Sequence, residues 1–427
     1  MTAPDVRILW LNVHGGVFHK LITLHERLAL AGISCELLIA VTPPRGLKIG
    51  ADVPKAALPE LAARGIHFLP RVEALHRAEA TPTRLLVTDA HHDPDLPGLI
   101  ARVHAREIAT AQMATLLGDF TCHGAQHLLL QHPLTLFFEL EYSHTDEAHR
   151  FFRALGVHFT GNIFYEPTLN RLHGGYPTRE AFCAKYGFNP ARPLCLWLPN
   201  YADARHPDYG RVIRAVTEAG HNLAVKLHPW EYAFKKHGVD TWGLGETSDT
   251  FWGVHAVDEP DSTWAYRFCD IAIMRTSSTS LELPFWDKPA VQLPSTSYPG
   301  LVRAQAAMVA GCSAVLESIA ALPGLLAGPL PRPAPQDYAA ARALVRLDST
   351  RDAYTQTVEA LQSILAAPRA SGPQYPGADL KRLYDGLIAP EMSRALTPTR
   401  RLRFELGRLW RRLSAWPAPR RAPHTSI

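Results

Sequence analysis

The stretch VRILWLNVHGGVFHKLITLHERLALAG, residues 6–32, decides the expected fold class. Residues 6–13 form a mostly apolar run, which is typical of a β-strand buried on both faces of a sheet. The run breaks at Gly15 and Gly16, and the leucines that follow are spaced as on one face of a helix. Gly32 ends this helix, as glycine commonly does. A strand, a glycine turn and a helix in this order predict the first unit of a parallel α/β sheet.

The alternation of strands and helices continues and then restarts in the second half of the chain. Further strands are expected at 35–41, 66–70, 84–90, 193–199, 221–228, 251–257, 271–278 (strand, then loop) and 289–293, with helices at 209–220, 262–270 and 280–287. Two rounds of alternation predict an α/β fold of two Rossmann-like, doubly wound domains facing a cleft. The predicted domains are 1–168 and 169–390, with their join near the glycine- and proline-rich stretch 170–178, followed by a basic tail at 391–427.

Composition bounds the class of protein. The chain has 427 residues, 47% hydrophobic and 20% charged, which is typical of a soluble globular protein with a full core. Its six cysteines include no C-x-x-C pair, so a disulfide framework or zinc knuckle is not expected and a reducing compartment is. No apolar run reaches the roughly 18 to 20 residues that span a bilayer, and the first one is too short for a signal peptide. These features predict a cytoplasmic protein.

Positive charge is concentrated in the tail. Residues 391–427 contain nine arginines and two glutamates, so their charge is +7 and residues 1–390 carry −3 of the net +4. Between residues 400 and 416, apolar side chains recur every three or four positions. This pattern predicts an amphipathic helix on the anionic inner face of the cytoplasmic membrane, with a helix packed on the protein itself as the alternative. Nucleic-acid binding is not expected, because the body carries no basic stripe or motif.

A histidine ends one of the expected strands of the second half. His228 closes the run 221–228, and Pro229 fixes the backbone directly after it. Ligands of doubly wound sheets bind beyond the carboxyl ends of the strands, where an imidazole can donate to a phosphate oxygen. A strand-end histidine that meets solvent is the alternative.

A hydroxyl-rich loop follows the next expected unit. Thr276, Ser277 and Ser278 come after a strand and before a helix, where small hydroxyl residues cap the helix and free N–H groups face an anion. Glu282 follows one turn later, placed to accept hydrogen bonds from ribose hydroxyls. A plain capping box that begins at Thr279 is the alternative. Because His228 and this loop lie in successive units of one domain, a nucleotide site is the better joint interpretation.

Four stretches in the same order resemble a known group of enzymes: GVHFTGNIFYEPT (156–168), REAFCAKYGFNPARPLCLWLPNY (179–201), KLHPW (226–230) and CDIAIMRTSSTSLELPFWDKPAVQL (269–293). They resemble the donor domain of GT-B fold transferases, most of all the CDP-glycerol glycerophosphotransferases and related bacterial capsule transferases. Bacterial sialyltransferases and sugar-acid transferases carry a similar His-Pro and Ser/Thr-Ser pairing for a cytidine nucleotide. Arg275 and Thr276 replace the segment in which the family has an aspartate before the serine pair.

The resemblance implies a nucleotide-activated donor, CDP-, CMP- or UDP-linked, and no cofactor or bound metal. The implied donor-binding residues are Lys226, His228, Pro229, Arg275, Thr276, Ser277, Ser278 and Glu282.

The first half is then expected to hold the acceptor and the catalytic base. Gly15 and Gly16 let the backbone approach the donor phosphates, and His14 and His19 flank that loop. His123, followed by a glycine, resembles the "WHG" motif in which glycerophosphotransferases place a catalytic histidine. A histidine suits removal of a proton from an attacking hydroxyl because its pKa lies near working pH. Asp119 is the carboxylate alternative.

The segment TDAHHDPD, residues 88–95, offers aspartates and histidines after a strand. Metal ligands need convergent geometry, and a proline-containing loop more often holds solvated polar side chains, so no metal site is predicted here.

The sequence therefore predicts a cytoplasmic, membrane-associated transferase. It moves a glycosyl or polyol-phosphate group from a nucleotide donor to a surface-polysaccharide or lipid-linked acceptor. A nucleotide-sugar 2-epimerase and a catalytically inactive nucleotide- or glycan-binding protein are the alternatives.

Overall fold

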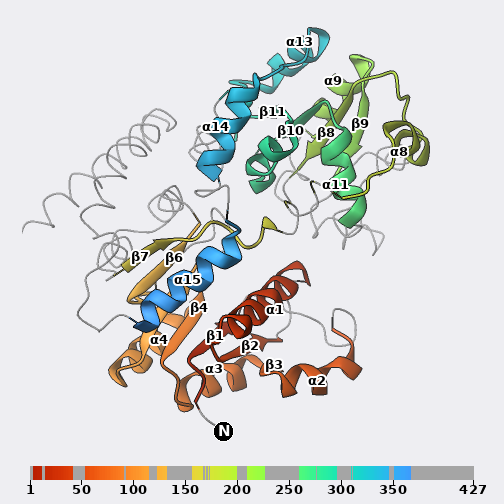
Figure 1. Ribbon diagram of the computed structural model, residues 1–427. Helices are drawn as coiled ribbons and strands as arrows, with labels where there is room; N and C mark the ends of the chain where they lie inside the picture. The colour runs from red at the N-terminus through yellow and green to blue at the C-terminus, as the bar shows by residue number, and fades with distance from the viewer. Residues whose placement is uncertain are drawn as a thin grey trace, which may run out of the picture.

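The computed structural model describes residues 3–11, 15–41, 53–90, 93–114, 123–131, 156–166, 169, 172, 174–199, 209–226, 259–275, 277–295, 309, 311–345 and 351–366. Within these residues the chain forms two separate parallel sheets with helices on both faces (Figure 1). The predicted α/β fold class with two parallel sheets is confirmed. The expected strand at 251–257 and the basic tail at 391–427 lie outside the described residues.

The first sheet has seven parallel strands in the order β3-β2-β1-β4-β5-β6-β7. The strands are β1 (Val6–Trp10), β2 (Cys35–Ala40), β3 (Ile66–Leu69), β4 (Leu85–Asp89), β5 (Ala109–Met113), β6 (His127–Leu130) and β7 (Gly156–Phe159). The helices between them are α1 (Gly15–Leu30), the 3-10 helix η1 (Lys55–Ala57), α2 (Leu58–Ala63), α3 (Arg71–Ala80) and α4 (Leu96–Ala105). All five side chains of β1 are buried, which explains why its sequence is apolar except at Arg7.

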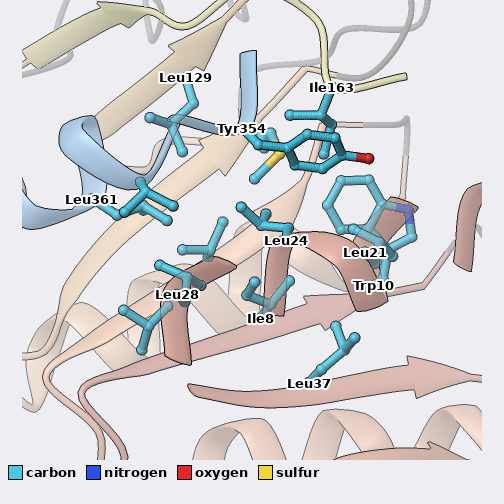
Figure 2. Packing of buried hydrophobic residues seen from close by; sticks show 14 of the residues in the cluster. Ile8, Trp10, Leu21, Leu24, Leu28, Leu37, Leu129, Ile163, Tyr354 and Leu361 are labelled. Carbon is cyan, nitrogen blue, oxygen red and sulfur yellow. The ribbon is translucent and has the colours of Figure 1, made fainter. Parts of the chain in front are cut away.

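One face of this sheet is completed by a helix from much later in the chain. Helix α15 (Ala353–Ala366) packs beside α1, across the strands of the first sheet (Figure 1). Figure 2 shows side chains of α15, α1 and β1 in one cluster, among them Leu361, Leu24 and Ile8. All three are fully buried. The core of the first sheet therefore includes residues that follow the second sheet in sequence.

The start of α15 is tied to the chain that leaves the first sheet. Glu166 is 1% exposed, and its Oε1 accepts a hydrogen bond from the Ala353 backbone N–H at 2.8 Å. Asp352 Oδ1 accepts from the Thr355 N–H at 2.6 Å. Both carboxylates satisfy N–H groups that have no partner inside the helix, and their charge suits the helix N-terminus.

The opposite face of the first sheet is covered by α3 and α4 and contains one buried charge pair. Arg7 on β1 is fully buried, and its Nε donates to Glu36 Oε2 on β2 at 2.5 Å. Arg7 and Glu36 are register partners in the parallel pair. Arg77 of α3 also donates to Glu36, at 2.8 Å. Burial alone raises the pKa of Glu36, but the bonds from Arg7 and Arg77 hold that pKa below its usual value.

The second sheet has five parallel strands in the order β12-β11-β10-β8-β9. The strands are β8 (Leu194–Leu198), β9 (Asn222–Val225), β10 (Ile271–Met274), β11 (Ala290–Gln292) and β12 (Ser313–Val315). One face packs on α9 (Tyr209–Glu218) and α13 (Leu322–Ala327), which follows the 3-10 helix η6 (Ile319–Ala321). The other face packs on α8 (Arg179–Tyr186), α11 (Glu259–Phe268) and the 3-10 helix η5 (Leu283–Trp286), against which α14 (Pro335–Val345) lies.

Each sheet reverses its winding direction at one position. In the first sheet the chain runs outward from β1 to β3 and then returns to β4 on the other side of β1. In the second sheet it runs from β8 to β9 and returns to β10 on the other side of β8. Doubly wound sheets bind their ligands at such reversals, beyond the carboxyl ends of the strands. The candidate site is therefore expected beside these two reversals.

Candidate functional site

Two cationic residues flank the carboxyl end of β8, at the reversal of the second sheet. Lys226 directly follows β9, and its backbone N–H donates to the Trp197 carbonyl of β8 at 3.0 Å. Arg275 directly follows β10, whose last residue is the register partner of Leu198. The two backbones therefore lie two strand spacings apart, about 10 Å. Arg275 is 7% exposed and Lys226 is half-buried, so both charges are held in partly dry surroundings.

Tyr266 of α11 joins the ends of β9 and β10. Its side chain is 2% exposed, and its hydroxyl accepts a hydrogen bond from Lys226 Nζ at 2.6 Å. The same hydroxyl is hydrogen-bonded to the Thr279 side chain, and the negative charge of Glu282 lies near enough to affect its pKa. Burial raises the pKa of Tyr266, and Glu282 raises it further, against the opposing effect of Lys226. Tyr266 is therefore a neutral phenol at physiological pH.

The loop after β10 differs in detail from the prediction of one short helix over 280–287. It forms two 3-10 turns, η4 (Ser278–Leu281) and η5. Pro284 has no N–H to donate, and the neighbouring amides bond three residues back, as the Glu282 N–H does to the Thr279 carbonyl. Ser277, not Thr279, is the cap: its Oγ accepts from the Thr279 N–H at 3.4 Å. The capping box at Thr279 is therefore wrong, because that residue lies inside the turn.

Of the predicted donor-binding residues, Lys226 is hydrogen-bonded to Tyr266, and Glu282 lies near enough for its charge to raise the pKa of Tyr266. Glu282 is 9% exposed, and Ser277 lies at the start of the same turn. For Ser278 only the backbone is described. Five predicted site residues lie outside the described part of the chain: His14, Asp119, His228, Pro229 and Thr276.

The reversal of the first sheet carries the glycine turn. Gly15 and Gly16 begin α1, shortly after the carboxyl end of β1. Asp89, the last residue of β4, accepts a hydrogen bond from the Leu11 N–H at 2.9 Å, which fixes the exit of β1 beside β4. His19 lies one turn into α1 with an exposed side chain, against the ring of Phe18.

His123 is buried beside the carboxyl ends of β4 and β5. It is 4% exposed, and its backbone N–H donates to Gln112 Oε1 on β5 at 2.8 Å. Asp93, which follows β4, lies close enough for the His123 charge to lower the pKa of its carboxyl. Burial acts in the opposite direction, but a 2.6 Å bond from Arg71 helps to hold that pKa below its usual value. Gln112 therefore fixes the backbone at His123, and the Asp93 carboxyl lies near enough to interact with the charge of its side chain.

The aspartates of the segment 88–95 make ion pairs and hydrogen bonds within the fold. Arg71 contacts both Asp93 and Asp95 at 2.6 Å, and Asp89 binds the Leu11 backbone. No cluster of acidic, histidine or cysteine side chains suited to a metal ion occurs among the described residues. His91 and His92 lie outside them.

Two residues of these clusters, Tyr266 and Gln112, were not singled out from the sequence, and Asp93 was considered only within the segment 88–95 as a metal ligand. Gln112 carries no clear signal in the sequence, since its burial, which requires a polar partner, is known only from the structure. Tyr266 carries little, because a tyrosine on the apolar face of a helix is ordinarily a packing residue.

In the part of the chain that the structure describes, no helix combines the length and apolar character needed to cross a bilayer.

Comparisons with known proteins bear on the fold. No family model matches the chain, and no curated protein matches it. Among solved structures, MurG from Acinetobacter baumannii is 11% identical, with a TM-score of 0.47 over 84% of this chain and 100% of that chain. The wall teichoic acid polymerase TagF is 9% identical, with a TM-score of 0.48 over 84% and 88%. A putative UDP-N-acetylglucosamine 2-epimerase from Listeria monocytogenes is 12% identical, with a TM-score of 0.48 over 85% and 96%.

All three TM-scores are below 0.5, so the class of this protein rests on its own topology and residues. That class is a two-sheet, doubly wound α/β protein with cationic residues at the reversal of the second sheet.

Proposed function

We propose that this protein is a metal-independent, GT-B-like transferase. It moves a glycosyl or polyol-phosphate group from a nucleotide-activated donor to an acceptor hydroxyl. The observation that carries the proposal is the placement of Lys226 and Arg275 on either side of the end of β8, where doubly wound sheets bind ligands. Cations that follow two strands whose backbones lie about 10 Å apart suit the pyrophosphate or phosphate of a nucleotide.

The proposed donor-binding residues have different chemical roles. Lys226, Arg275 and the hydroxyls of the Ser277 loop stabilise the negative charge that grows on the leaving phosphate, together with His228. Preorganised donors at such a charge supply much of the rate enhancement of enzymes. Glu282 holds the ribose. CDP-, CMP- or UDP-linked donors fit this set, and the resemblance in sequence favours a surface-polysaccharide or lipid-linked acceptor.

His123 is the base of the proposed reaction. As the acceptor oxygen bonds to the transferred group, the bond to the donor phosphate oxygen breaks and the hydroxyl proton passes to the imidazole. Gln112 accepts a hydrogen bond from the backbone N–H of this histidine, and the Asp93 carboxyl lies within range of its charge. Asp119, His14 and His19 are the other candidates for this role.

Arg275→Met is expected to weaken nucleotide binding by at least about tenfold, because a charge-assisted hydrogen bond to phosphate is lost. A thermal-shift screen of the wild-type protein against UDP, CDP, CMP, GDP and ADP first identifies the ligand, since binding to the native state raises its stability. Calorimetric titration then compares the variant with Arg214→Met, which removes an exposed arginine of α9 in the same domain.

Unchanged affinity in Arg275→Met, or no stabilisation of the wild-type protein by any of these nucleotides, contradicts the proposed donor site. Incubation with a UDP-sugar alone tests the epimerase alternative, which requires formation of an epimer without an acceptor. Tight nucleotide binding without transfer or hydrolysis of any donor identifies an inactive binding protein instead.

The basic segment 391–427 is proposed to hold the enzyme at an anionic membrane surface on the cytoplasmic side. The full chain is expected to sediment with vesicles that contain phosphatidylglycerol and to be released by high salt, because the attraction is electrostatic. A chain that ends at residue 390 is the control. Equal sedimentation of the two chains contradicts the role of the tail.

A further inference from the structure

The contact between Lys226 and Tyr266 connects the proposed donor-binding segment after β9 to a helix of the second sheet. Lys226 follows β9, and Tyr266 lies on α11, which precedes β10. The ammonium is 2.6 Å from the phenol oxygen and 5.3 Å from the centre of the ring. These two distances place the ammonium beyond the hydroxyl, in line with the ring, and not above its face. The attraction is therefore a hydrogen bond to oxygen and not a cation–π contact.

The hydroxyl of Tyr266 has a second partner on the loop after β10. It is hydrogen-bonded to the side chain of Thr279, which is 6% exposed inside η4. Ser277 caps the same turn by accepting a hydrogen bond from the Thr279 N–H. A single oxygen thus connects the end of β9 to the turn that carries the serine pair.

The surroundings make this connection rigid. The ring of Tyr266 packs with the ring of Trp286, at 6.1 Å between centroids, and both belong to the core of the second sheet. Tyr266 is 2% exposed, so the bonds of its hydroxyl do not compete with water. Hydrogen bonds in such dry surroundings hold their geometry more firmly than exposed ones.

We infer that Tyr266 is a positioning residue for the donor site: its hydroxyl holds Lys226 and the η4 turn in register, so that the two segments meet the phosphates of a nucleotide together. This inference rests on the proposed function. It assigns a role to a residue of α11 that lies outside every motif quoted from the sequence. Tyr266 itself touches no substrate, and Lys226 acts on the ligand in a geometry set by this phenol.

The test removes only the oxygen atom. Tyr266→Phe keeps the packed ring and is expected to raise the Kd for CDP or UDP, whichever the wild-type protein binds, about tenfold by calorimetric titration. Tyr338→Phe is the matched control, because it removes the hydroxyl of another buried tyrosine of the second sheet's helices, on α14. That variant is expected to bind as the wild-type protein does.

A double-mutant cycle separates positioning from a general structural role. In the Lys226→Met background, Tyr266→Phe is expected to change the Kd by less than about twofold, since the group it positions is already absent. Should Tyr266→Phe fail to fold, Thr279→Val removes the other bond to the same oxygen and is expected to weaken binding severalfold.

The outcomes are distinct. Wild-type affinity in Tyr266→Phe, or the same tenfold loss with and without Lys226, overturns the inference and leaves the proposed function standing. Absence of binding of UDP, CDP, CMP, GDP and ADP by the wild-type protein overturns both.

Discussion

Replacing Glu36 with alanine is expected to lower the free energy of unfolding by about 3 to 5 kcal/mol, because it leaves the fully buried Arg7 without its counter-charge. A solvated arginine tolerates such a loss, but the Arg7 side chain has no access to water on β1. The midpoint and slope of urea denaturation measure the change.

The matched control is Glu79→Ala. Glu79 makes two hydrogen bonds to Arg102, at 2.8 and 3.0 Å, but both side chains are well exposed. Its removal is expected to cost less than about 1 kcal/mol. Similar losses in the two variants contradict the view that burial makes the Arg7–Glu36 pair essential. The double variant Arg7→Met/Glu36→Met is expected to recover much of the stability, since no buried charge then remains on these strands.

His123→Ala is expected to lower kcat by about 100- to 10,000-fold, the usual contribution of a positioned general base. The Kd of the donor is expected to stay within about twofold, because the histidine acts on the acceptor. Activity and donor affinity are measured separately, with the donor that the nucleotide screen identifies. The activity that remains is expected to lose the acid limb of its pH profile, since that limb reports protonation of the base.

His25→Gln is the control for the loss of a buried histidine. His25 lies on α1, is 6% exposed and bonds the Cys35 carbonyl through Nε2 at 3.0 Å. Burial lowers the pKa of His25, in keeping with a neutral structural side chain. This variant is expected to lose stability but to keep kcat. If His123→Ala keeps kcat within a few-fold of the wild-type value, the base is a different residue.

The strands that could be predicted are those that contain a run of apolar residues. They include strands inside a sheet, such as β1, β4, β8 and β10, and the edge strands β3 and β9. Strand β5 has the sequence ATAQM, and its polar residues concealed it, because Gln112 is buried for a hydrogen bond and not for packing. Strand β12 is three residues long, too short to show a period.

Some residues of the candidate site could likewise be predicted from the sequence, and others could not. Lys226 and Arg275 were found because they stand in stretches that resemble a known family, and Ser277 because a hydroxyl-rich loop after a strand suits an anion. Tyr266 was not found, because it lies 40 positions from Lys226 and only the folded chain brings the two together. The type of turn after β10 also escaped prediction, since a capping pattern does not distinguish an α-helix from two 3-10 turns.

The return of α15 to the first sheet has a consequence for synthesis. The strand β7 closes the sheet at Phe159, but the helix that covers one of its faces begins only at Ala353. At about 5 to 20 residues per second, a ribosome needs roughly 10 to 40 seconds to make the chain between them. During that interval Leu24, Ile8 and their neighbours lack the cover that Leu361 provides in the finished protein. The nascent first half therefore carries an open apolar surface that suits a chaperone, and it can close only after the second sheet has been made.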